Sequence, residues 1–147
     1  MINSGVMRRI AAMLLAMPLM AVSMPSASVE FDLTGLRNTR GAVHACLTRN
    51  PAHFPDCKSD PLALKRTVQA SAGKIDFKGV SPGLYALSVF HDENGNKKLD
   101  TFLGIPKEGF GFSRNPVVRF GPPRFDKVSM ELEPGFARTS VRMQYLL

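Results

Sequence analysis

The sequence predicts an all-β fold, namely an antiparallel β-sandwich of seven strands with one long structured loop after the fifth strand. Two observations point to it: apolar and polar residues alternate in short runs, and clusters of Pro, Gly, Ser and Asn separate these runs. Because each run has one apolar and one polar face, we expect the strands to bury their apolar faces between two sheets. A closed barrel is the alternative arrangement of the same strands.

The expected strands share this alternation, although the third is less regular than the others. In chain order they cover residues 30–34, 43–48, 64–70, 74–78, 85–89, 128–132 and 140–145. Turn residues stand between them, for example Pro82-Gly83 and Pro134-Gly135. Proline fixes φ at the value that a tight turn needs, and glycine accepts the positive φ that often follows.

Residues 1–28 have the features of a secretory signal peptide. Two arginines form a basic start, an apolar run follows at residues 10–22, and small residues come next. We expect cleavage between Ser23 and Ser28, which leaves residues 29–147 as a single β-sandwich domain. The apolar run is shorter than the roughly 20 residues of a membrane-spanning helix. We therefore expect a periplasmic or secreted protein with no membrane span after cleavage; a permanent anchor is the alternative.

The chain is basic, with 19 Lys and Arg against 12 Asp and Glu in 147 residues. It stays basic without the two arginines of the leader. Basic proteins bind nucleic acid, anionic membrane surfaces or acidic polymers. Export makes nucleic acid an unsuitable partner, so the candidate partners are an envelope polymer, a sugar or another exported protein, and the sequence identifies none of them. The interpretation that we favour is a basic surface that only contacts water.

Cys46 and Cys57 are the two cysteines of the chain. An exported protein with an even number of cysteines usually pairs them, so we expect a structural disulfide. Metal ligation with His44 or His53 and a redox pair are the alternatives, but the C-x-x-C spacing of such sites is absent from the sequence.

Residues 92–100 place oxygen atoms at alternate positions, which lets a short loop surround a calcium ion. The ligands expected in this calcium-loop pattern are Asp92, Asn94, Asn96, the backbone carbonyl of Lys98, and Asp100. Lys97 stands where such loops have glycine, and Leu103 stands where they have a bidentate glutamate. We therefore expect weak calcium binding at most. The alternative is a polar turn whose side chains bond to its own backbone.

Residues 91–124 show no alternation, and their apolar content is too high for a disordered linker. Within them, glycines alternate with aromatic residues, a pattern that brings backbone close to flat apolar rings. Such a pattern can build a ligand surface, for which the candidate residues are Phe102, Phe110, Phe112 and Arg114. The interpretation that we favour is a small satellite core beneath a long loop.

His91 and Asp92 form the best candidate for general-base catalysis, because a carboxylate can orient an imidazole ring. Neither a G-x-S-x-G nor an H-E-x-x-H motif occurs in the chain. The sequence therefore favours a non-catalytic binding or envelope-accessory module. A small periplasmic hydrolase that uses this pair is the alternative function.

Several motifs of the long segment occur together, namely HDENGN at 91–96, FLGIP at 102–106, EGFGFS at 108–113 and FGPP at 120–123. On these motifs the chain resembles the exported bacterial family catalogued as domain of unknown function 2141, over residues 29–145. The resemblance implies an immunoglobulin-like or transthyretin-like sandwich. It supplies no activity and no catalytic residues.

Overall fold

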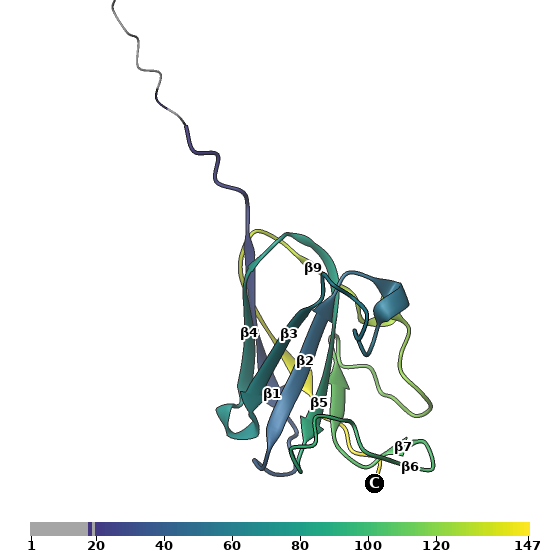
Figure 1. Cartoon of the computed structure of the whole chain (residues 1–147). Coiled ribbons are helices and arrows are strands. Elements are labelled where there is room, and N and C mark those ends of the chain that lie inside the picture. Colours follow the sequence, from purple (N-terminus) through teal and green to yellow (C-terminus); the bar gives the residue numbers. More distant parts are fainter. Residues whose placement is uncertain (1–17, 19) are drawn as a thin grey trace, which may run out of the picture.

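The computed structural model describes residue 18 and residues 20–147 (Figure 1). The first strand begins at Ala27, whose side chain is already part of the core. The predicted signal peptide lies largely outside the described residues. Within the part of the chain that is described, no helix is long and apolar enough to cross a membrane.

The described residues form ten strands in three sheets, with three short helical turns between them. The strands are β1 (Ala27–Thr34), β2 (Ala42–Thr48), β3 (Leu64–Gln69), β4 (Lys74–Val80), β5 (Gly83–Asp92), β6 (Thr101–Phe102), β7 (Ile105–Pro106), β8 (Phe110–Phe112), β9 (Met130–Leu132) and β10 (Gly135–Arg142). The helical turns are η1 (Pro51–His53), η2 (Ala70–Ala72) and α1 (Phe125–Val128). The predicted β class is confirmed, but the predicted number of strands is wrong.

The strands form two main sheets and one small hairpin. The first sheet has the order β10-β1-β4, and the second has the order β3-β2-β5-β8, with β9 also paired to β5. The hairpin is β6-β7. The main sheets stay separate and do not close into a barrel.

One pairing departs from the predicted antiparallel arrangement, because β10 runs parallel to β1. The reason is the place where β9 ends. Leu132 lies opposite Gly83, at the end of the molecule where β1 begins, and the Gly135 N–H bonds to the carbonyl of Ser26. From there β10 has to follow β1 in the same direction.

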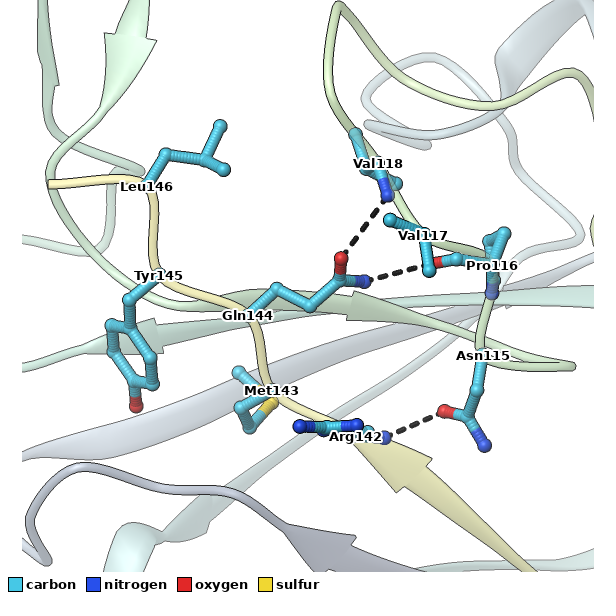
Figure 2. A pocket seen from close by; sticks show the side chains of 9 residues that line it. All are labelled: Asn115, Pro116, Val117, Val118, Arg142, Met143, Gln144, Tyr145 and Leu146. Carbon is cyan, nitrogen blue, oxygen red and sulfur yellow. Dashed lines mark hydrogen bonds between the residues drawn. The ribbon is translucent and has the colours of Figure 1, made fainter.

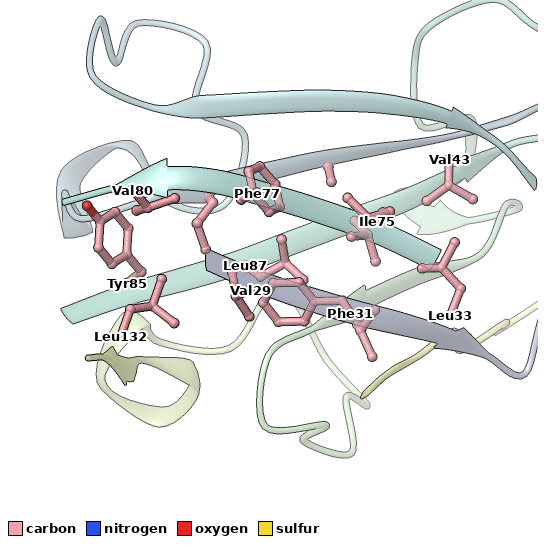
Figure 3. Packing of buried hydrophobic residues seen from close by; sticks show 14 of the residues in the cluster. Val29, Phe31, Leu33, Val43, Ile75, Phe77, Val80, Tyr85, Leu87 and Leu132 are labelled. Carbon is pink, nitrogen blue, oxygen red and sulfur yellow. The ribbon is translucent and has the colours of Figure 1, made fainter. Parts of the chain in front are cut away.

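The core lies between the two main sheets (Figure 3). The first sheet contributes alternate residues of β1 and β4, such as Phe31 and Phe77, whose rings meet edge to face at 6.3 Å. The second sheet contributes residues such as Val43 and Leu87, which are fully buried. In β1 and β4 the alternation in the sequence therefore corresponds to burial of one face of the strand.

Two predicted strands are displaced. Val128 ends the short helix α1, and β9 begins at Met130. The last strand begins at Gly135 instead of near residue 140, because the first six residues of β10 have almost no buried side chain and give no apolar signal. Backbone pairing with β1 forms this part of the strand.

A second, smaller cluster lies on the outer side of the second sheet. Cys46 of β2 is joined to Cys57 by a disulfide, the pairing that the sequence predicted, with Cα atoms 6.5 Å apart. The segment between them brings Phe54 against Phe112 of β8 and Phe125 of α1, with ring centroids 5.7 and 6.0 Å apart. Phe54 therefore covers the outer face of β8 and contacts α1, both of which lie in the segment after β5.

Candidate functional site

Asp92, the last residue of β5, organises the polar loop that follows it, and its side chain is 1% exposed. Its carboxylate accepts hydrogen bonds from the backbone N–H groups of Gly95 (2.8 Å), Asn96 (3.1 Å) and Lys97 (2.8 Å). Burial raises the pKa of Asp92, but the hydrogen bonds from His44 and from these N–H groups outweigh burial and hold the pKa below its usual value. The loop is therefore folded around a buried carboxylate.

The other expected calcium ligands bond to one another. The amide groups of Asn94 and Asn96 donate hydrogen bonds to the two carboxylate oxygens of Asp100, at 2.6 and 2.8 Å. The side-chain oxygens of the same two asparagines accept hydrogen bonds from the backbone N–H groups of Asn96 and Lys98. The structure thus brings all predicted ligands into one loop, in the pattern of a self-bonded polar turn.

Glu108 closes this loop from the other side. It is buried, and its two carboxylate oxygens accept hydrogen bonds from the backbone N–H groups of Glu93 and Asp100, both at 3.0 Å. The side chain of Glu93 accepts hydrogen bonds from Arg37 and Asn38, both at 2.8 Å. Burial raises the pKa of Glu93, but the bonds from Arg37 and Asn38 lower it below its usual value.

In this arrangement the carboxylates of Asp92, Asp100 and Glu108 all have N–H partners. Among the described residues, no group of three or more His, Cys, Asp or Glu side chains is placed to hold a metal ion. Calcium would have to displace the Asn94 and Asn96 amides from Asp100. The residue types suit a hard cation, but the geometry described does not, so calcium binding stays a prediction.

We call residues 93–100, which two buried carboxylates hold by hydrogen bonds, the braced loop. The β6–β7 hairpin follows it and has a two-residue turn of Leu103 and Gly104 (Figure 1). Both have positive φ, 51° and 80°, which is the backbone of a type I′ turn. Such turns favour Asn-Gly, and a leucine in this region is unusual. The side chains of Phe102, Leu103 and Ile105 are 59%, 86% and 42% exposed. We call these three side chains the apolar tip.

Three lysines border the apolar tip in sequence. Lys97 and Lys98 precede β6, and Lys107 follows β7 directly; all three are exposed. None of them forms an ion pair with a carboxylate of the described residues. These lysines outnumber the partly exposed carboxylate of Asp100, directly before β6, so the net exposed charge next to the tip is positive.

His91 does not pair with Asp92, so the proposed orientation of its ring by that carboxylate is wrong. His91 is fully buried, and its ring nitrogens bond to the hydroxyl of Tyr145 (2.9 Å) and the backbone carbonyl of Arg40 (2.6 Å). Successive residues of a strand point to opposite faces, which separates the two side chains. Burial raises the pKa of the Tyr145 hydroxyl above its usual value.

Asp92 instead joins a row of three polar side chains across the second sheet. His44 of β2 bonds to Asp92 at 3.0 Å and to the hydroxyl of Thr67 of β3 at 2.9 Å. The amino-acid sequence does not reveal this row, because the pairing of His44 with Thr67 depends on the register of β2 and β3. The polar faces of the two predicted strands were the one available signal.

Phe110 and Phe112 are buried in the second cluster, which agrees with the favoured satellite core and leaves these two rings off the surface. β8 pairs with β5, and both rings pack beneath the segment around Phe54. A Cβ on Gly111 would lie 2.8 Å from the backbone carbonyl oxygen of Arg142. Phe102 and Arg114, the other two predicted residues, are exposed.

Two shallow hollows occur near this segment. The first, about 450 Å³, lies between residues 115–118 and residues 142–146 (Figure 2). Gln144 extends across it and bonds to the backbone N–H of Val118 and the carbonyl of Pro116. The second, about 410 Å³, is lined by prolines and phenylalanines of residues 51–55 and 122–126, together with Arg124 and Asp126. Neither contains the apolar tip or the row of His44.

Residues 31–140 match the model of a family described as an uncharacterized protein conserved in bacteria, domain of unknown function 2141. The chain belongs to this family. The matched region runs from β1 into β10 and includes the braced loop and the apolar tip. No curated protein and no solved structure matches the chain.

Proposed function

We propose that this family member is a non-catalytic binding module of the bacterial cell envelope, with the β6–β7 hairpin as its contact surface. The observation that supports it is the apolar tip, where three apolar side chains extend into water from a loop fixed by buried carboxylates. A loop that only connects β5 and β8 is not stabilised by apolar side chains that stay in water.

The backbone of the tip supports the same proposal. Leu103 has φ 51°, a conformation that costs a non-glycine residue about 1–3 kcal/mol. An Asn-Gly turn would avoid most of this cost and would remove the most exposed of the three apolar side chains from water. The side chain of Leu103 is exposed, so no buried contact offsets the strain of its backbone. Such a residue is better explained by binding than by folding.

The rest of the molecule fits the role of scaffold. We propose that the two facing sheets form an immunoglobulin-like or transthyretin-like domain, exported through the signal peptide that residues 1–28 predict. The Cys46–Cys57 disulfide is compatible with an oxidising compartment outside the cytoplasm. Rigid sheets that carry a binding loop at one end are a common arrangement in proteins.

The predicted weak calcium binding by residues 92–100 remains a separate proposal. It would add rigidity to a loop that Asp92 and Glu108 already hold. The contact surface does not depend on it, because the apolar tip lies outside the loop's ring of hydrogen bonds.

Binding to isolated bacterial envelopes tests the proposed function. Wild-type protein should sediment with envelopes, and Leu103→Asn should stay in the supernatant at the same protein concentration. Phe136→Asn is the matched control, because Phe136 is 70% exposed on β10 at the opposite end of the sheets. Equal sedimentation of wild type and Leu103→Asn would refute the proposal.

A further inference from the structure

The loop after β5 exposes its positive charges more than its negative ones. Its carboxylates at Asp92 and Glu108 are buried, and that of Glu93 is held by arginine and asparagine side chains. The carboxylate of Asp100 is partly exposed and bonds to two asparagine amides. Its three lysines are exposed and form no ion pair among the described residues. Three exposed lysines against one partly exposed carboxylate give the loop a net positive exterior around the apolar tip.

The size of the tip indicates what kind of partner it fits. A stable protein–protein interface buries about 800 Å² on each side, which is more than three side chains of one short hairpin supply. A lipid bilayer needs no complementary pocket, since its interface accepts a small apolar projection and its anionic head groups attract nearby lysines. Phenylalanine, leucine and isoleucine surrounded by lysine match both layers of such a surface.

Resting on the proposed function, we infer that the β6–β7 hairpin docks on a bilayer that contains anionic lipid, with Phe102, Leu103 and Ile105 among the acyl chains. Lys97, Lys98 and Lys107 then contact phosphate groups of the lipids. The partner is the lipid surface itself, and the sheets remain in water above it.

Tryptophan fluorescence gives a direct test, because the chain contains no tryptophan. Leu103→Trp places a single reporter at the tip, and Phe136→Trp places one at the other end, beside the start of β1. Both proteins are purified after export, in the form that the cell processes. With phosphatidylglycerol vesicles we expect the emission of Leu103→Trp to shift to shorter wavelength and that of Phe136→Trp to stay unchanged. An unchanged Leu103→Trp spectrum would overturn the inference.

The charge contribution is tested with vesicle co-sedimentation. Removal of two lysines by Lys97→Gln with Lys98→Gln should weaken binding to anionic vesicles by about one order of magnitude. Lys65→Gln with Lys127→Gln is the matched control, with the same loss of charge on β3 and α1, and should retain most of the binding. Equal weakening by both pairs would show attraction by net charge alone and would overturn the docking geometry.

Failure of the lipid inference can be told apart from failure of the proposed function. Loss of envelope sedimentation by Leu103→Asn, together with no binding of wild type to vesicles of extracted envelope lipid, would show that the tip contacts a protein or polymer and that the lipid inference is wrong. If Leu103→Asn sediments with envelopes like the wild type, and the wild type does not bind the vesicles, the contact surface itself is refuted. Binding to phosphatidylcholine vesicles as strong as to phosphatidylglycerol vesicles would overturn the role of the lysines.

Discussion

The segment after β5 contains two short stretches that look alike in sequence and differ in structure. Residues 102–105 and residues 110–112 both combine phenylalanine with glycine. In the first, Phe102 is 59% exposed, whereas in the second Phe112 is 6% exposed. The composition of the two stretches does not explain this difference, so their neighbours must.

Strand pairing separates the two stretches. β8 pairs with β5, and Phe110 also bridges to Gln144, so its backbone is fixed at the edge of the second sheet. Gly111 lets the backbone of β8 lie close to the backbone of Arg142, where a side chain at position 111 would have no room. Among the described strands β6 pairs with β7 alone, and the apolar side chains of this hairpin stay exposed. One stretch therefore serves stability and the other is available for binding.

Truncation of the two phenylalanines should give the largest difference. Phe112→Ala removes a ring from the second cluster and should lower the free energy of unfolding by about 3–5 kcal/mol. Phe102→Ala removes an exposed ring and should change it by less than about 0.5 kcal/mol. Urea denaturation of both variants measures the difference, and equal losses would show that the tip is a packed part of the fold.

Removal of the disulfide should act on the buried stretch alone. Replacement of Cys46 and Cys57 by alanine frees the segment that holds Phe54 against Phe112, and should cost about 2–4 kcal/mol of unfolding free energy. Binding to envelopes at a temperature where the variant is folded should match that of the wild type. A loss of binding in the folded variant would contradict the independence of the two stretches.

Asp92→Asn should loosen the support of the apolar tip. An amide offers one acceptor oxygen where the carboxylate serves three backbone N–H groups and His44. We expect a loss of about 1–3 kcal/mol, because buried N–H groups lose their partner. Hydrogen exchange should be faster at Gly95 and Lys97 and unchanged in β1. Protection that stays at wild-type level would show that Asp92 does not hold the loop.

Acid should produce a more gradual loss. The pKa values of Asp92 and Glu93 lie below their usual range, so the unfolded chain binds protons at a higher pH than the folded one. The stabilisation is complete above the unfolded pKa values of about 4 and is lost as the pH falls through the folded ones. Urea denaturation between pH 7 and pH 3 measures this, and Asp92→Asn should show a smaller decrease than the wild type.

Sequence reasoning predicts the parts of this molecule where side chains alternate into the core. The strands around Phe31, Val43, Phe77 and Leu87 were found because every second residue is apolar and buried. β10 was misplaced at its start, because backbone bonds to β1 hold its exposed residues and leave no apolar signal. The contact of His44 with Thr67 depends on the register between β2 and β3. The sequence of one strand does not show that register.

The candidate site was predicted in part for the same reason. Alternation of oxygen side chains correctly grouped Asp92, Asn94, Asn96 and Asp100 in one loop, since that grouping is local. The roles of Glu108 and of His91 depended on how distant segments pack. The glycine and phenylalanine pattern predicts the same surface for residues 102–105 and 110–112, because the sequence does not show which stretch pairs with another strand.

Calcium should have the smallest effect and tests the remaining open feature of the loop. With a dissociation constant of about 1 mM, as in weak extracellular sites, about 5 mM calcium would raise the free energy of unfolding by about 1 kcal/mol. The gain is limited because the ion has to replace the Asn94 and Asn96 amides at Asp100. Thermal denaturation with chelator and with calcium measures it, and Asp100→Asn should abolish the difference. Identical melting temperatures of the wild type in both solutions would leave the loop as a self-bonded turn, whose only role is to hold the apolar tip away from the sheets.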